Sequence, residues 1–315
     1  MYDSIFISRG LSLSRLKVLL EVDEAGGIAG AAEGNPVRQS QYSRQLKELE
    51  SFFGCELTHR DGRSLRLTKR GKELALIARE NLTSLTDFLA DCEKQTTILR
   101  IGAGESIIRW LITPALPEIS KRLPSVSFDF RNIRSQEAIT QLSESQIDLA
   151  IVRAELVPNH LESKFIGSLD YALYIPKALA KKIATNPSKR KNPSLNKLIE
   201  GIPFGRMESS GRLATSLQET ETDTPILLMD SLPSLCNAIA SGFCCGVLPT
   251  IAEQEISVSD LETRSKASIN SFEIYRPRET KKMSRKLALV WNNRFEIVRQ
   301  NAATAIKTFA EELKI

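Results

Sequence analysis

The chain has 315 residues, a formal net charge of +5 and 26% charged residues, a composition typical of a soluble globular protein with room for two or three domains. The mild positive charge permits a local nucleic-acid surface but does not require one. No run of about 18 apolar residues is present, which argues against a membrane-spanning helix. The first ten residues include Asp3 and Arg9 without a sustained apolar run, so no secretion signal is predicted.

The cysteines and histidines give little support for catalysis. Five cysteines at irregular spacing fit neither a disulfide framework nor a metal cluster, which favours a reducing cytoplasm. His59 and His160 have no spacing typical of a metal site or of a base beside a nucleophile. Cys236, Cys244 and Cys245 form either a redox switch or part of a buried core. We therefore expect no enzymatic activity, no metal and no cofactor.

Two helices are expected before residue 36. The first runs from about Ser12 to Ala25, where leucines repeat at helical spacing, and Gly26–Gly27 ends it. The second is short and rich in alanine, and Gly34–Asn35–Pro36 closes it because proline pushes the preceding residue out of the helical region.

The helix after this turn separates an apolar stripe from a polar face. Its apolar positions recur at i, i+4, i+7 and i+11, namely Tyr42, Leu46, Leu49 and Phe53. The other faces carry Arg38, Gln39, Gln41, Arg44, Gln45 and Lys47. Arg and Gln side chains make paired hydrogen bonds to guanine and adenine edges, so the pattern predicts a helix-turn-helix whose second helix enters the DNA major groove. The alternative is an ordinary surface helix in a helical hairpin.

Residues 55–67 resemble two short alternating strands around an Asp61–Gly62 turn. Basic side chains lie on this hairpin and directly after it, namely Arg60, Arg63, Arg66, Lys69, Arg70 and Lys72. Because each neutralised phosphate releases counterions, a basic hairpin beside a polar helix suits contact with the DNA backbone. The two features together predict a winged helix-turn-helix.

Thr68 is a suitable N-cap, and the sequence from Lys69 to about Glu93 predicts one long helix. A helix of roughly 25 residues is about 37 Å long, which exceeds what one small domain can cover. Its apolar seam therefore predicts a partner helix, most simply the same helix of a second subunit. The alternative is a spacer helix that lies on its own domain.

From Thr97 onward strands and helices alternate, which predicts parallel sheets with helices on their faces, arranged in two α/β lobes. The expected strands are Ile98–Gly102, Val126–Arg131, Asp148–Val152, about Gly201–Pro203, Ile226–Met229, Gly246–Pro249 and Ser284–Val290, with an extended segment at Leu169–Ile175. The expected helices are Ser106–Lys121, Ser135–Ser143, Leu232–Ser241 and a closing helix at Ile297–Leu313. Residues 186–193 are expected to form a loop.

These residues resemble the LysR-type transcriptional regulators over nearly the whole chain. The most specific matching pieces are Ala31–Glu33, Gln39–Glu50, Leu65–Thr68 with Gly71, Leu99–Gly102, Ile147–Ile151, Ile239–Gly242 and Leu248–Pro249. The resemblance implies an α+β multidomain protein: an N-terminal winged helix-turn-helix at 1–68, a linker helix that dimerises at 69–95, and a two-lobed effector domain at 96–315 similar to periplasmic binding proteins. Lobe one would comprise 96–165 and 272–315, and lobe two 166–271.

The resemblance also implies a small effector between the lobes. Gly104, Glu105 and Ser106 end one strand and open a helix, where free backbone N–H groups and the helix dipole favour an anion. Ser135 has the analogous place after the next strand. Residues expected to face them from lobe two are Phe204, Gly205 and Arg206. For Ser106 and Ser135 the alternative role is plain helix capping.

The leading hypothesis is a dimeric or tetrameric regulator that binds double-stranded DNA under the control of a small-molecule effector. Residues expected to read bases are Arg38, Gln39, Gln41 and Arg44, and those expected to hold phosphates are Ser40, Tyr42, Lys47, Arg60 and Arg63. The competing class is an enzymatic or ligand-binding α/β module with a helical N-terminal extension. A third class is a purely structural interaction protein, which would depend on neither ligand nor DNA.

Overall fold

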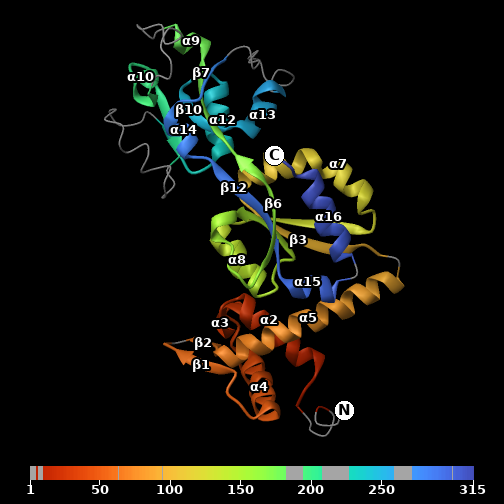
Figure 1. The fold of residues 1–315 in the computed structure, drawn as a ribbon. Helices are drawn as coiled ribbons and strands as arrows, with labels where there is room; N and C mark the ends of the chain where they lie inside the picture. The colour runs from red at the N-terminus through yellow and green to blue at the C-terminus, as the bar shows by residue number, and fades with distance from the viewer. Residues whose placement is uncertain are drawn as a thin grey trace. The chain divides into compact units, whose positions relative to one another are not determined.

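The computed structural model describes residues 5, 10–62, 64–93, 95–181, 194–207, 227–258, 272–299 and 301–315. The chain divides into two compact units, each of which is traced in Figure 1. The first comprises residues 1–97, 144–146 and 297–300, and the second comprises 98–143, 147–296 and 301–315. Among the described residues no helix combines the length and the apolar character that crossing a bilayer requires.

The first unit is a helical domain with a two-stranded hairpin. Its elements are α2 (Leu13–Glu24), α3 (Ile28–Ala31), α4 (Pro36–Phe53), β1 (Thr58–Asp61), β2 (Ser64–Leu67) and α5 (Lys69–Cys92). Strands β1 and β2 pair antiparallel across the turn at Gly62. Leu19 of α2 and Leu46 and Leu49 of α4 are fully buried in one core. The predicted winged helix-turn-helix is confirmed.

Helix α4 begins where the turn sequence requires it to begin. The side chain of Asn35 accepts hydrogen bonds from the backbone N–H groups of Val37 and Arg38 at 2.9 and 3.2 Å. Pro36 occupies the first helical position, where its missing N–H costs nothing and its fixed φ suits the helix. Asn35 and Pro36 thus both end the preceding turn and start α4.

Glycine allows the hairpin to pack closely on the start of α5. A Cβ atom added to Gly71 would lie only 2.2 Å from the carbonyl oxygen of Leu57. The hydroxyl of Thr68 accepts from the Gly71 N–H at 3.0 Å and donates to the carbonyl of Glu56 at 2.9 Å. Thr68 therefore caps α5 as predicted, and it also ties α5 to the segment that precedes β1.

In the second unit, lobe one is a five-stranded sheet in the order β4-β3-β5-β12-β6. The strands are β3 (Thr97–Ala103), β4 (Val126–Asn132), β5 (Leu149–Arg153), β6 (Glu162–Leu169) and β12 (Arg285–Trp291). The helical elements are α6 (Glu105–Ile107), the π-helix η1 (Ile108–Ile112), α7 (Thr113–Arg122), α8 (Ser135–Ser143), η2 (Ala154–Leu156), α15 (Asn293–Val298) and α16 (Ala302–Glu312). Helix α8 covers one face of the sheet, while α7 and α16 cover the other (Figure 1).

Lobe two is a second five-stranded sheet in the order β11-β7-β10-β8-β9. The strands are β7 (Tyr171–Pro176), β8 (Phe204–Met207), β9 (Leu227–Met229), β10 (Cys245–Pro249) and β11 (Phe272–Tyr275). The helices are α9 (Lys177–Ala180), α10 (Leu195–Ile199), α12 (Leu232–Ala240), η4 (Thr250–Ala252), α13 (Glu253–Val258) and α14 (Arg278–Lys282). The loop expected at 186–193 lies outside the described residues.

The expectation of parallel sheets was wrong, because both sheets are mixed. Strand β3 runs parallel to β5, but β12 runs antiparallel to both β5 and β6. In lobe two, β8 is parallel to β9 and β10, whereas β7 is antiparallel to β10 and β11. The antiparallel strands are those that carry the chain between the two lobes, so they enter each sheet without a helical crossover.

The chain also changes lobes at points other than those expected. Strand β6 keeps it in the first sheet through Leu169, beyond the expected exit at 165. Strand β11 still belongs to the second sheet, so the return follows Tyr275 rather than preceding Phe272. The single closing helix expected at Ile297–Leu313 is instead α15 and α16, separated near Arg299, which is buried and pairs with Asp87 at 2.8 Å.

Candidate nucleic-acid interface and effector site

The outward face of α4 carries most of the side chains expected to contact DNA. Ser40, Gln41, Arg44 and Lys47 are exposed, and Gln39 is half-buried. The Arg44 side chain is 84% exposed, and its Nε lies 3.3 Å from a carboxylate oxygen of Glu48. This pairing between neighbouring helical turns is weak in water, so Arg44 stays available for another acceptor.

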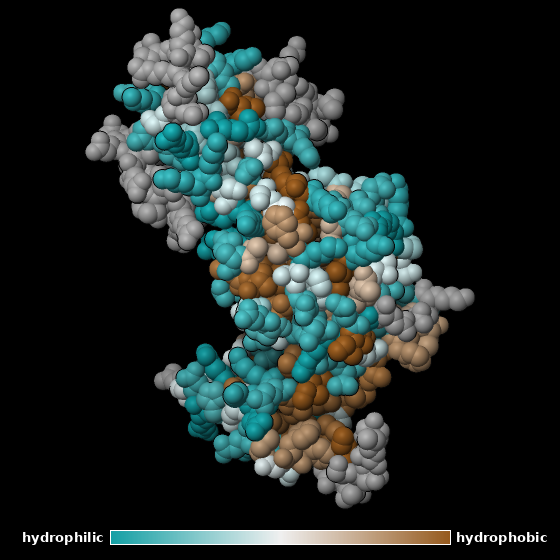
Figure 2. Space-filling model, viewed as in Figure 1, coloured by the Kyte–Doolittle hydropathy of each residue, from teal (hydrophilic) through white to brown (hydrophobic). Residues whose placement is uncertain are grey.

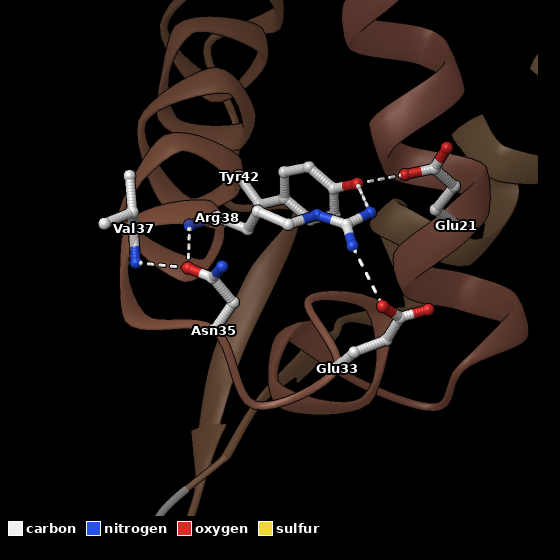
Figure 3. Close-up of polar contacts among 6 residues, drawn as sticks. All are labelled: Glu21, Glu33, Asn35, Val37, Arg38 and Tyr42. Carbon is white, nitrogen blue, oxygen red and sulfur yellow. Dashed lines mark hydrogen bonds and ion pairs between the residues drawn. The ribbon is translucent and has the colours of Figure 1, made fainter.

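Arg38 differs from these residues because it is held by two other side chains (Figure 3). Its Nη1 lies 3.2 Å from a carboxylate oxygen of Glu33, and its Nη2 donates to the Tyr42 hydroxyl at 3.2 Å. The guanidinium carbon lies 5.7 Å from the centroid of the Tyr42 ring. The hydrogen bond to Tyr42 raises the pKa of Arg38 above its ordinary value, so the guanidinium is charged at every physiological pH.

Tyr42 is placed differently from expectation. It is buried in the core of the first unit, and its hydroxyl donates to a carboxylate oxygen of Glu21. A phenol that is buried and bonded on both sides is not free to bind phosphate. The structure therefore argues against Tyr42 as a phosphate contact and places it instead as a support for Arg38.

The hairpin formed by β1 and β2 carries the expected basic side chains, and some of them form ion pairs within the protein. Arg60 is exposed, while Arg66 forms an ion pair with Asp61 at 3.1 Å. Arg70, at the start of α5, pairs with Glu73 at 2.8 Å. The predicted contact Arg63 lies outside the described residues.

In lobe one, the expected effector residues gather at one edge of the sheet. Gly104 lies between the end of β3 and the start of α6, and a Cβ added to it would meet nothing within 4 Å. The Ile133 N–H donates to the Ala103 carbonyl at 3.0 Å, which brings the end of β4 beside the end of β3. The Ser135 hydroxyl accepts from the Arg153 N–H at 3.4 Å, which adds the end of β5.

Glu105 and Ser106 occupy the first turn after Gly104. Glu105 is exposed and Ser106 is half-buried. The Gly104 carbonyl accepts from the backbone N–H groups of Ile107 and Ile108 at 2.9 and 3.0 Å, so the earlier N–H groups of the turn are open to a ligand. The exposed carboxylate of Glu105 beside this turn opposes an anion that approaches from its side.

The expected contacts from lobe two were partly wrong. Phe204, Gly205 and Arg206 lie within β8 rather than after a strand at 201–203, because regular pairing begins where Phe204 meets Cys245. Phe204 is buried in the core. A Cβ on Gly205 would lie 2.8 Å from Leu235 and 2.9 Å from the Cys244 sulfur, so no side chain fits at this position of β8. Only Arg206 is half-buried with a side chain able to reach outward.

Sequence reasoning missed several residues that define these sites. Glu21 and Glu33 escaped notice because their contacts to Tyr42 and Arg38 depend on how three helices pack. Asn35 was interpreted only as a turn residue, although an Asn before Pro at a helix start is a recognised capping signal. Arg153 is the last residue of β5, one residue beyond the strand expected at Asp148–Val152. Gly104 and Ser135 were selected because they follow strands, and the same reasoning applied to this strand would have found Arg153.

The three cysteines considered for redox chemistry are buried. Cys236, Cys244 and Cys245 are free thiols with at most 1% of their surface exposed. Burial raises the pKa of Cys236 and Cys245 to about 12 and that of Cys244 to about 11. Since the thiolate is the reactive form, these values favour the buried-core interpretation. Across the described ranges, His, Cys, Asp and Glu form no group of three or more that could hold a metal ion.

Comparison with known proteins settles the family. Residues 13–72 match the family described as bacterial regulatory helix-turn-helix protein, lysR family, and residues 93–291 match the LysR substrate binding domain. The chain belongs to the LysR family. It is 30% identical over 203 residues to the HTH-type transcriptional regulator MetR of Escherichia coli K12, an alignment that covers 63% of each chain. It is 32% identical over 211 residues to HdfR of Yersinia enterocolitica, covering 64% of this chain and 71% of HdfR.

Solved LysR-family structures share the fold over the full length. Full-length OxyR from Pseudomonas aeruginosa superposes with a TM-score of 0.62 at 17% identity, covering 97% of this chain and 95% of OxyR. LysG from Corynebacterium glutamicum superposes with a TM-score of 0.59 at 16% identity, covering 96% of this chain and 98% of LysG. At these identities the comparison supports the fold and not the ligand.

The buried thiols lead to a prediction of selective reactivity. In the native protein at pH 8, iodoacetamide should modify exposed Cys92 and leave Cys236, Cys244 and Cys245 unmodified, because their raised pKa values keep them protonated. Peptide mass spectrometry measures the modification at each site, and urea-unfolded protein is the control in which all five cysteines react. Rapid native alkylation of Cys244 or Cys245 would contradict the prediction.

Proposed function

We propose that this LysR-family protein is a sequence-specific DNA-binding transcriptional regulator whose DNA binding is modulated by a small-molecule effector held between the two lobes. The observation that carries the proposal is the exposed polar face of α4 beside the basic hairpin of β1 and β2. We expect it to work in the cytoplasm without enzymatic activity. An enzymatic or ligand-binding module with an N-terminal extension is the competing function, and it would not need a DNA-reading surface.

The side chains of α4 divide by chemistry into two groups. We assign base reading to Arg38, Gln39, Gln41 and Arg44, whose planar ends suit bidentate hydrogen bonds to purine edges. We assign phosphate contact to Ser40, Lys47 and Arg60, and from the sequence to Arg63. Phosphate contacts set the position of the protein on the duplex, and base contacts set which sequence it prefers.

The effector would bind at the lobe-one edge formed by the ends of β3, β4 and β5. Open backbone N–H groups follow Gly104, and Ser106 and Ser135 carry hydroxyls in the segments that follow β3 and β4, which favours a ligand with an anionic or strongly polar group. LysG, whose solved structure shares this fold, holds arginine as its bound effector. Arginine is therefore included among the ligands to be tested for this chain. From lobe two, we retain Arg206 as a contact.

Helix α5 supports a homodimer. Four apolar side chains on it, Ile77, Leu85, Phe88 and Leu89, are each more than half exposed. Their spacing of 8, 11 and 12 residues places them on one side of the helix. Figure 2 shows apolar surface gathered along this helix. We propose that the same stripe of a second chain covers it, with pairing of dimers into tetramers as a further arrangement.

The DNA-binding role predicts distinct effects for base and phosphate contacts. Gln41→Ala and Arg44→Ala should each weaken binding to a preferred duplex by about 1–3 kcal/mol. Lys47→Ala should weaken binding to all duplexes alike and reduce the salt slope by about 0.9 per subunit. The measurement is fluorescence anisotropy with a duplex that the wild-type protein enriches from a random pool and with a scrambled duplex. Lys121→Ala, an exposed lysine of the second unit, is the control. Unchanged affinity of both base-contact variants would reject the assignment.

The effector role predicts stabilisation by a ligand. Amino acids and short carboxylic acids are screened for an increase in the thermal midpoint, and a ligand at about 100 times its Kd should add about 2.7 kcal/mol. Gly104→Leu should fold normally, because its Cβ meets open space, and should lose the ligand-dependent increase because the new side chain occupies that space. An increase that persists in Gly104→Leu would place the effector elsewhere.

The dimer predicts sensitivity to charge on the stripe. Phe88→Glu should shift the protein from dimer to monomer in sedimentation velocity, because a buried unpaired carboxylate costs several kcal/mol. Thr86→Glu adds the same charge to an exposed position on another side of α5 and should leave the dimer intact. A dimer that survives Phe88→Glu would mean that another surface holds the subunits together.

A further inference from the structure

Glu33 lies in the turn between α3 and α4, directly beside the site assigned to DNA. Its backbone has a φ of +51°, and its side chain is 81% exposed. The carboxylate forms an ion pair with Arg38 at 3.2 Å, on the side of the guanidinium away from Tyr42 (Figure 3). A negative charge therefore lies within one hydrogen-bond length of a guanidinium assigned to base reading.

Arg38 makes one contact to buried Tyr42 and one to exposed Glu33, and the two contacts differ in strength and in role. The buried Tyr42 donates its proton to Glu21, so the lone pairs of its oxygen face the Arg38 guanidinium, which donates to it at 3.2 Å. This contact holds Arg38 from inside the domain. The Glu33 contact is exposed, and because ion pairs of that kind are weak in water, an incoming acceptor displaces it at little cost.

The Glu33 carboxylate repels some hydrogen-bond acceptors on DNA more strongly than others. A phosphate oxygen brings a full negative charge, and two unit charges about 5 Å apart in water repel by about 0.8 kcal/mol, a factor of about four in binding. The O6 and N7 atoms of guanine are neutral acceptors and meet no such repulsion. Glu33 thus penalises the phosphate backbone, which every sequence offers, more than it penalises a base edge, which only some sequences offer.

We propose that Glu33 is a specificity-determining residue of the DNA interface, and that its charge reserves Arg38 for a base edge by disfavouring capture of the guanidinium by phosphate. The inference rests on the proposed function, in which Arg38 reaches DNA. In this role Glu33 changes how well the protein distinguishes one DNA sequence from another, and not how tightly it binds its preferred duplex.

The test is Glu33→Gln, which removes the charge while keeping the size of the side chain and an oxygen that can accept from Arg38. Binding is measured against the duplex enriched by the wild-type protein and against a scrambled duplex, each over a series of salt concentrations. For each subunit that contacts the duplex, affinity for the scrambled duplex should rise about fourfold, which is the repulsion above expressed as a ratio. The salt slope should steepen by about 0.9 per subunit as Arg38 gains a phosphate. Affinity for the enriched duplex should change less than about twofold, because a neutral base edge meets no such repulsion.

Two matched variants separate this effect from others. Glu118→Gln removes the same charge from an exposed ion pair with Lys121 in the second unit, and it should leave the affinity ratio unchanged. In the Arg38→Ala background, Glu33→Gln should no longer alter the ratio, because the residue it acts through is gone.

The outcomes distinguish this inference from the proposed function. If Arg38→Ala weakens binding to the enriched duplex but Glu33→Gln leaves the affinity ratio unchanged, the role of Glu33 is rejected while Arg38 remains a base contact. If the random pool yields no enriched duplex, both fall. If Arg38→Ala changes nothing while Gln41→Ala and Arg44→Ala weaken binding, the role of Glu33 is rejected and the proposed function stands. If Glu33→Gln changes the ratio equally with and without Arg38, the charge acts on the whole interface and the inference is overturned.

Discussion

Burial of the apolar side of α4 is the constraint on which the DNA-facing surface depends. Leu46 and Leu49 are fully buried against Leu19 of α2, and fully burying a leucine side chain contributes about 1.5–3 kcal/mol. Because those positions must point inward, helical geometry sends Gln41, Arg44 and Lys47 outward. The rotation of α4 about its axis is therefore set by hydrophobic packing, and the polar face follows from it.

The same core also extends into a polar network at its margin. Tyr42 belongs to the apolar stripe by spacing, yet its hydroxyl reaches Glu21 and accepts from Arg38. A buried tyrosine needs a partner for its hydroxyl, and here that need positions the guanidinium assigned to base reading. The packing of α2 against α4 and the orientation of Arg38 are thus parts of one arrangement.

In the second unit, the pairing of the strands that connect the two sheets determines which residues lie at the edge of each sheet. β6 and β12 form an antiparallel pair at one side of the first sheet, which leaves the parallel pair β3 and β5 to present its carboxyl ends beside the start of α6. Ser135 links to Arg153 at that edge. In lobe two, Phe204 of β8 packs into the hydrophobic core, and the close packing around Gly205 leaves no room for a side chain there.

Local pattern in the sequence was enough for the first unit. Apolar spacing, the Gly34–Asn35–Pro36 turn, the Asp61–Gly62 hairpin and Thr68 each act over a few residues, so they predicted the winged helix-turn-helix and the start of the long helix. The outward position of Gln41 and Arg44 followed from the same periodicity, because a helix with one apolar stripe has only one way to bury it.

Only the tertiary structure decided the rest, because it depends on residues far apart in the chain. Strand β12 returns antiparallel to β5 and β6, and β8 lies inside its sheet, because strands from distant parts of the chain pair there. Near the break between α15 and α16, Arg299 makes a buried contact with Asp87. The Glu21–Tyr42 bond and the Glu33–Arg38 pair likewise require separate helices to meet at set angles. Periodicity tells which side of an element is buried, but it carries no information on what that side is buried against.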